Sequence, residues 1–132
     1  MANANEATAL SPGRLRILSE KLAAGKGLRG KLSVVRALTK ERWSANGHRD
    51  VIAVPMAKLD GERIYVRPQT TDLSNAVNYL KYGIHRPPPS VGDPRRIVEL
   101  GTNMGAGLTA LALEHPEAQL VGIEPDEGNF AV

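Results

Sequence analysis

A chain of 132 residues has room for one domain at most, and its composition excludes several classes of protein. The absence of cysteine excludes disulfide scaffolds, cysteine-ligated zinc sites and thiol catalysis. The net charge of +3 combines a basic front part, with ten Lys or Arg against three acids in residues 1–49, and an acidic last part, with two against seven in residues 91–132.

The charge pattern and the apolar runs limit the partners we expect. Basic residues are spaced through helical patterns, and only one Trp and one Phe are present to stack on bases, so we expect no nucleic-acid partner. No apolar run approaches the ~20 residues of a membrane span, and the N-terminus lacks the charged region and apolar core of an export signal. We therefore expect no membrane partner and a cytoplasmic location.

The chain divides into three parts: a disordered N-terminus over residues 1–12, a helical and hairpin lead-in over residues 13–90, and a nucleotide-binding unit over residues 91–132. In the lead-in, apolar residues recur at helical spacing in two runs, which predicts a pair of helices. The first face holds Leu15, Leu18 and Leu22, and the second, after a loop over residues 25–30, holds Leu28, Leu32, Val35 and Leu38.

Residues 25–31 read GKGLRGK and match the phosphate-loop pattern G-x-x-x-x-G-K. A phosphate loop needs a preceding strand and a Ser or Thr hydroxyl that binds magnesium. Here a helical pattern precedes the segment, and Leu32 occupies the position of the hydroxyl. We therefore interpret the segment as a flexible basic loop between two helices.

A β-hairpin and a third helix complete the lead-in. Residues 51–56 and 64–66 are strand-like runs on either side of Asp60-Gly61, a dipeptide that supplies the positive φ values of a tight turn. Thr71 or Asp72 can then cap a helix. Its apolar face holds Leu73, Val77 and Leu80, its end is expected at Gly83, and a stiff proline connector follows over residues 87–94.

Residues 96–132 predict a βαβ unit of α/β class. The apolar run 97–100 is typical of a strand buried on both faces, and a glycine-rich turn follows it directly. A helix then ends at His115-Pro116, and residues 120–123 form the next strand. Because the strand ends lie side by side in a right-handed crossover, we expect the carboxylate of Glu124 near the mouth of the turn, where a ribose diol would meet two acceptor oxygens.

The spacing of the glycines indicates which ligand this turn binds. A dinucleotide site usually has G-x-G-x-x-G, but this turn reads E-L-G-T-N-M-G, with Asn103 where the second glycine would fall. A pyrophosphate gains nothing from the nearby carboxylate of Glu99, whereas an ammonium group does. The pattern therefore favours S-adenosylmethionine, which carries an ammonium group and no phosphate.

The pattern E-x-G-x-N-x-G after one strand, followed by G-I-E-P at the end of the next, resembles the S-adenosylmethionine-dependent methyltransferases, most closely the FkbM type. Residues 64–73, IYVRPQTTDL, also resemble the lead-in of that family. The resemblance implies the start of a class I methyltransferase Rossmann-like fold and the cofactor S-adenosylmethionine. It implies that the methionine end is held around Glu99, Gly101, Thr102, Asn103 and Gly105, and the ribose hydroxyls by Glu124.

The resemblance further implies methyl transfer to oxygen, on a hydroxyl of a sugar or a natural-product scaffold, without a metal. It gives Thr71 and Asp72 a second interpretation, as a cap that also lines the amino-acid end of the cofactor. The family continues through more strands, so we interpret the chain as truncated and inactive by itself, with apolar surface left bare. The acceptor, the oligomeric state and the general base stay open.

The general base has one candidate among the histidines. His48, His85 and His115 are too far apart in the chain to form a helical metal pair, and we expect them on the surface. His85, beside the proline connector, is the one that could border a substrate entrance and act as a base. Asp126 and Glu127 most simply favour the N-terminus of a helix that they open.

Two rival functions remain. A nicotinamide-dependent oxidoreductase would use the same acid at the strand end for its ribose, although Asn103 in place of the second glycine counts against it. Alternatively, the chain is an inactive binding or assembly module that acts through its basic helices.

Overall fold

A computed structural model of the chain describes residues 11–40 and 50–132. The expected disorder of residues 1–12 and the expected surface position of His48 therefore lie outside the described residues, except at Ser11 and Pro12. Pro12 is the first residue of a helix, which suits proline because its missing N–H is not needed there.

The predicted pair of helices is confirmed as α1 (Pro12–Ala24) and α2 (Gly27–Thr39). The joint between them is shorter than predicted and tightly packed, so the expected flexible loop is wrong. A Cβ on Gly25 would lie 2.6 Å from the backbone carbon of Gly30, and the Lys26 N–H donates to the Pro55 carbonyl at 2.8 Å. This joint follows a helix rather than a strand, which agrees with the rejection of a phosphate loop.

Helix α2 buries a different face from the one predicted. Gly30, Val34 and Ala37 are buried, whereas Leu28, Leu32 and Val35 are exposed. The reason is the close approach of α2 to the hairpin, since a Cβ on Gly30 would lie 2.7 Å from the Pro55 carbonyl oxygen. Large side chains do not fit such an approach, so the small residues turn inward.

The hairpin is confirmed as the antiparallel pair β1 (Ile52–Pro55) and β2 (Arg63–Val66). A 3-10 turn over Ala57–Leu59 precedes Asp60 and Gly61, whose φ values of 53° and 98° are positive as predicted. Alternate residues of both strands point into the core. They are Ile52, Val54, Ile64 and Val66.

Helix α3 (Asp72–Tyr82) buries the predicted face and ends at Gly83, which has a φ of 61°. Its N-terminus differs from the prediction. Neither the Thr71 nor the Asp72 side chain makes a capping hydrogen bond to this helix. The Asp72 N–H instead donates to Thr70 Oγ1 at 3.2 Å. The Asp72 carboxylate is instead fully buried and paired with Arg67, as described below.

The predicted βαβ unit is confirmed as β3 (Arg96–Leu100), α4 (Ala106–Glu114) and β4 (Gln119–Ile123). The strands pair in parallel with Arg96 opposite Gln119, and a short 3-10 turn over Pro89–Val91 interrupts the proline connector. A last helix, α5 (Glu127–Phe130), begins after Asp126, whose carboxylate accepts the Asn129 N–H as a cap. That cap agrees with the sequence prediction for this acid.

The prediction that β3 is buried on both faces is wrong. Val98 is 61% exposed and Leu100 is 75% exposed, and no residue of β3 or β4 is fully buried. The described residues place α4 against the two strands and put no further layer on their outer face. The expected bare apolar surface is therefore present in the described part of the chain.

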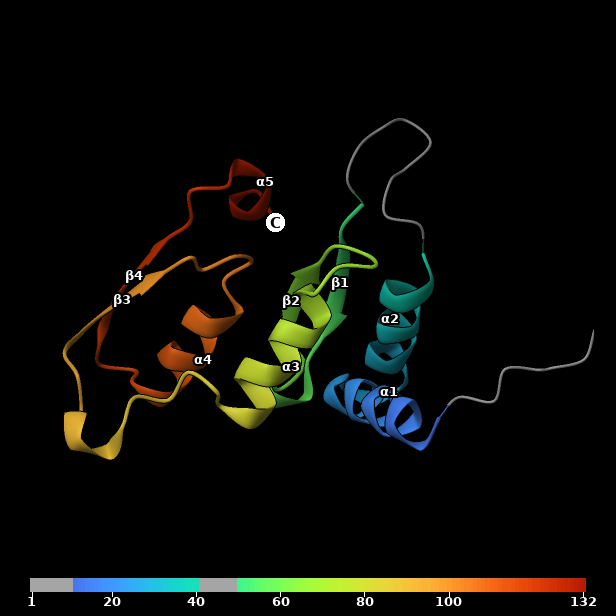
Figure 1. Cartoon of the computed structure of the whole chain (residues 1–132), viewed down its shortest axis with the longest axis horizontal. Helices are drawn as coiled ribbons and strands as arrows, with labels where there is room; N and C mark the ends of the chain where they lie inside the picture. Colours follow the sequence, from blue (N-terminus) through green and yellow to red (C-terminus); the bar gives the residue numbers. More distant parts are fainter. Residues whose placement is uncertain (1–10, 41–49) are drawn as a thin grey trace, which may run out of the picture.

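In Figure 1 the elements form a row: the β3–β4 sheet, then α4, then α3 with the hairpin, and finally α1 with α2. One hydrophobic core runs along this row and reaches the βαβ unit through Ala106 and Ala110 of α4. The fold is therefore mixed α/β, with two separate two-stranded sheets among the described residues. No described helix has the length and apolar character needed to cross a membrane, and the cytoplasmic location stays a prediction.

Candidate functional site

The turn between β3 and α4 brings most of the predicted site residues together. Its backbone has positive φ values at Gly101 (74°), Asn103 (51°) and Gly105 (79°). Asparagine is among the few residues other than glycine that tolerate this region, which explains Asn103 at a position where the backbone turns. The Gly101 and Thr102 N–H groups donate to the Ile123 carbonyl at 2.7 and 3.3 Å, so the turn is attached to the end of β4.

Glu124 lies at the mouth of this turn, as predicted. Its Oε2 accepts the Asn103 N–H at 2.6 Å, and its Oε1 accepts the Asp126 N–H at 2.9 Å and the Asn129 side-chain amide at 3.3 Å. The hydrogen bond from the Asp126 N–H, together with those from Asn103 and Asn129, lowers the pKa of Glu124 below its ordinary value. The carboxylate is therefore ionised and accepts hydrogen bonds only.

These bonds change the expected contact with a ribose. An ionised carboxylate offers about four acceptor positions, and groups of this chain fill three of those on Glu124. One acceptor position therefore remains, on Oε2, whereas the sequence prediction required a free acceptor on each oxygen of the carboxylate. A diol that binds with both hydroxyls must therefore displace the long hydrogen bond from Asn129.

Arg67 connects the turn to the lead-in, and it is the site residue whose role the sequence did not reveal. Its guanidinium binds both carboxylate oxygens of Asp72 at 2.7 Å, and its NH2 group also donates to Asn103 Oδ1 at 2.9 Å. Its NH1 group donates to Asn129 Oδ1 and to the Gly128 carbonyl. Every donor of the guanidinium is thus occupied by α3, the glycine turn or α5.

This arrangement answers the question about Thr71 and Asp72. Burial by itself raises the pKa of Asp72, but the hydrogen bonds and charge of Arg67 outweigh it and hold the pKa below its ordinary value. Asp72 is fully buried behind Arg67, and Thr71 is exposed without a capping bond. Asp72 therefore acts on the turn through Arg67, which fixes the Asn103 side chain.

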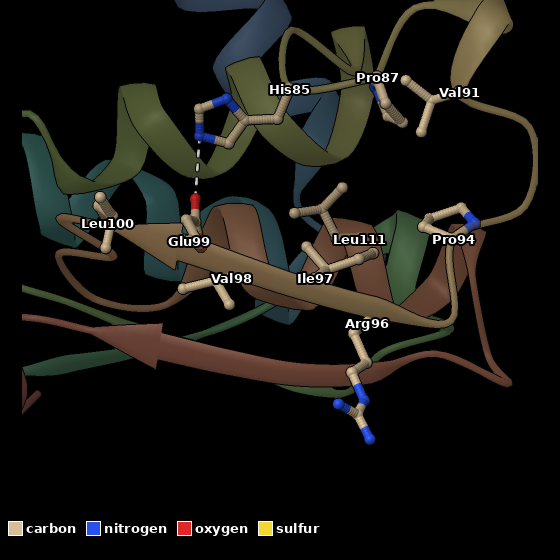
Figure 2. A pocket seen from close by; sticks show the side chains of 10 residues that line it. All are labelled: His85, Pro87, Val91, Pro94, Arg96, Ile97, Val98, Glu99, Leu100 and Leu111. Carbon is tan, nitrogen blue, oxygen red and sulfur yellow. Dashed lines mark ion pairs between the residues drawn. The ribbon is translucent and has the colours of Figure 1, made fainter.

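Glu99 is the predicted site residue that lies apart from Asn103 and Glu124. Figure 2 shows its side chain rising from β3 toward His85, whose Nε2 lies 2.9 Å from Glu99 Oε1. The His85 ring is stacked on Tyr79, with ring centroids 4.1 Å apart. His85 and Glu99 line one end of an otherwise largely apolar cavity of about 450 Å³, which runs along β3 to Pro94.

The carboxylate of Glu99 is close to the first turn of α4. A Cβ on Gly107 would overlap Glu99 Oε1 and would lie 2.6 Å from His85 Cδ2, so glycine at this position makes room for both side chains. The Glu99 side chain is only 10% exposed, and its Oε2 has no hydrogen-bond partner among the described residues. Burial raises the pKa of Glu99, and the charge and hydrogen bond of His85, together with a hydrogen bond from the Leu108 backbone, oppose that effect.

A second hollow, of about 230 Å³, lies at the glycine turn itself. Its lining comes from the turn, from α4 and β4, and from the C-terminal residues, among them Asn103, Gly105, Gly122 and Asn129. Small-molecule sites usually measure roughly 300–1,000 Å³, so this hollow holds part of such a ligand. No atom lies within 4 Å of a Cβ built on Gly101 or Gly105, and a ligand can therefore approach both backbones closely.

The remaining histidines and acids do not add to the site. His115 lies at the end of α4, away from the turn. In the described ranges, no three His, Asp or Glu side chains converge in a way that could hold a metal ion. No family model matches the chain, and neither does a curated protein or a solved structure.

Proposed function

We propose that this chain forms the cofactor-binding part of an S-adenosylmethionine-dependent methyltransferase. The observation that carries the proposal is the bond between Glu124 Oε2 and the Asn103 N–H. This bond joins the acid at the end of β4 to the glycine turn. In that turn Asn103 replaces the second glycine of the dinucleotide pattern, the residue that makes room for a pyrophosphate. The ionised carboxylate of Glu124, with one acceptor position left, suits a ribose hydroxyl and repels a phosphate.

The position of Glu99 supports the same ligand. Its carboxylate lies against the first turn of α4, the helix into which the glycine turn opens, and one buried oxygen has no partner in the described part of the chain. A buried carboxylate oxygen without a partner is costly, and a donor with a positive charge is its most favourable complement. The α-ammonium group of S-adenosylmethionine is such a donor, so the two acids would bind opposite ends of one ligand.

The reaction that we propose is methyl transfer to a hydroxyl of a sugar or a natural-product scaffold. Bound S-adenosylmethionine supplies a sulfonium methyl group, which an oxygen nucleophile displaces in line. The residues of this chain hold the donor at its two ends and orient it. We assign no general base, and we propose no metal.

The first rival, a nicotinamide cofactor, is disfavoured because Asn103 occupies the position of the second glycine of the dinucleotide pattern and its side chain is held by Arg67. A binding or assembly role is the second candidate. The exposed apolar residues of α2 and β3 favour it, because bare apolar surface commonly marks an interface.

Calorimetric titration of the protein with S-adenosylhomocysteine, and separately with NADH, tests the proposal. We expect saturable heat with S-adenosylhomocysteine and none with NADH. Binding of NADH alone would favour the oxidoreductase, and silence with both ligands would favour the assembly role.

Two pairs of variants test the site itself. Glu124→Ala should weaken S-adenosylhomocysteine binding about ten-fold, whereas Glu127→Ala, an exposed acid in α5, should leave it unchanged. Gly101→Ala and Gly92→Ala both place a Cβ in open space at a positive φ, so both strain the backbone, and the ψ of −147° at Gly92 makes the control substitution a demanding one. Only Gly101→Ala should weaken binding, and equal affinities in these two variants would contradict the assignment of the turn.

A further inference from the structure

Glu99 lies 14 positions after His85 in the chain, yet the two side chains meet over α4. The 2.9 Å distance between His85 Nε2 and Glu99 Oε1 is that of a hydrogen bond, with the imidazole N–H as donor. The bond engages one oxygen of the carboxylate and leaves the other, Oε2, without a partner in the described residues.

Three features of the structure hold His85 in this position. Its ring stacks on Tyr79 of α3, the neighbouring Arg86 binds Glu114 of α4 at 2.7 Å, and Gly107 leaves room beneath the ring. A glycine inside a helix lowers the stability of the helix by roughly 1 kcal/mol relative to alanine, so Gly107 destabilises α4 locally. The room that it leaves is filled by Glu99 and His85.

The environment of Glu99 explains what such a partner does. A carboxyl group that is 10% exposed tends to take up a proton, and a protonated carboxyl no longer attracts an ammonium group. A hydrogen bond from His85 to one oxygen favours the ionised form and fixes the plane of the carboxylate. The second oxygen then has a defined direction.

We infer that His85 is a positioning residue that holds Glu99 so that its free oxygen binds the α-ammonium group of an amino-acid-bearing nucleoside. This inference rests on the proposed function and deepens it, because it names the residue that selects for the amino-acid end of the ligand. A nucleoside without an ammonium group gains nothing from the pair. His85 therefore sets a preference between two ligands that share the same adenosine part.

The experiment compares S-adenosylhomocysteine with 5′-methylthioadenosine, which keeps the adenosine and lacks the amino acid. Affinities for both are measured by calorimetry for the unaltered protein and for His85→Ala, His85→Gln and His115→Gln. Glutamine keeps an N–H donor near the position of the imidazole Nε2, alanine does not, and His115 lies outside the site.

We expect His85→Ala to lose about ten-fold in affinity for S-adenosylhomocysteine and to keep its affinity for methylthioadenosine. His85→Gln should restore most of the loss, and His115→Gln should match the unaltered protein. Equal losses for both ligands would show a merely structural role and overturn the inference. An unchanged affinity of His85→Ala for S-adenosylhomocysteine would overturn it as well.

A second variant keeps the test independent of the folding of His85→Ala. Gly107→Ala places a methyl group against both Glu99 Oε1 and the His85 ring, and it should separate the pair with the same selective loss. An unchanged preference between the two ligands in this variant would overturn the inference. If the unaltered protein binds no S-adenosylhomocysteine, the proposed function fails. If it binds and the variants keep its preference, only the role of His85 fails.

Discussion

The lead-in and the βαβ unit contain similar apolar sequences but bury them very differently. Of the fifteen buried apolar side chains in the described residues, twelve belong to α1, α2, α3 and the hairpin, and three belong to α4. The hairpin strands alternate between buried and less buried residues, whereas β3 and β4 contain no fully buried residue. An apolar run therefore predicts a strand without predicting its burial.

The difference follows from what covers each sheet. Helix α2 packs on β1 and α3 packs on β2, so the inward face of the hairpin meets side chains. The β3–β4 sheet has α4 on one side, and in the described chain its other side has no cover. A two-stranded parallel sheet cannot shield its own faces, and the burial of Val98 and Leu100 requires another layer.

Arg67 forms a buried ion pair with Asp72 of the lead-in and donates to Asn103 of the βαβ unit, and its removal should have the largest effect. Arg67→Ala leaves the fully buried Asp72 without its partner, so we expect a loss of roughly 3–5 kcal/mol in the free energy of unfolding. Urea denaturation measures it. Arg63→Ala, an exposed arginine in the strand that precedes Arg67, should change stability by no more than about 0.5 kcal/mol, and equal effects would contradict the role of the ion pair.

The next test compares one large side chain from each region. Met56 is fully buried beside the hairpin. Met56→Ala should lower the free energy of unfolding by roughly 2–5 kcal/mol, because it removes buried apolar atoms and leaves a cavity. Leu100→Ala, on the bare face of β3, should stay within about 0.5 kcal/mol. A large loss for Leu100→Ala would mean that this face is covered in solution.

The two regions should also respond to pH with opposite signs. The pKa of Asp72 is lowered in the folded protein, so its contribution to stability is present above the ordinary value of 3.8 and is lost as pH falls through the folded pKa. The pKa of Glu99 is raised, so its contribution is present below the ordinary value of 4.5 and is lost as pH rises through the folded pKa.

Glu99→Gln isolates the second of these contributions. Because glutamine carries no charge to bury, we expect this variant to be more stable than the unaltered protein at pH 7. The difference should shrink toward zero as pH falls to 4, and thermal unfolding across this range measures it. A difference that grows at low pH would have the wrong sign for a raised pKa.

The smallest expected effect is that of a polar substitution on the bare face. Val98→Thr keeps the shape of the side chain and places its hydroxyl in water, so stability should change by less than about 0.5 kcal/mol. Val54→Thr buries the same hydroxyl in the hairpin core and should cost roughly 1–3 kcal/mol. Equal costs at the two positions would remove the contrast between the regions.

The sequence by itself determined the features that depend on neighbours in the chain. Positive φ values at Asp60-Gly61 form the hairpin turn, Gly83 ends α3, and the order of strand, glycine turn, helix and strand predicts the βαβ unit. The meeting of Glu124 with the turn was also predictable, because parallel strands end at the same edge. Each of these follows from local backbone preferences or from simple topology.

Only the tertiary structure decided the features that join distant segments. It turned Gly30 and Val34 inward rather than the leucines of α2, because the hairpin approaches too closely for large side chains. It paired Arg67 with Asp72 and with the turn, and it brought His85 to Glu99 across the room left by Gly107. Such contacts depend on which faces meet in space, and no periodicity along the chain encodes that.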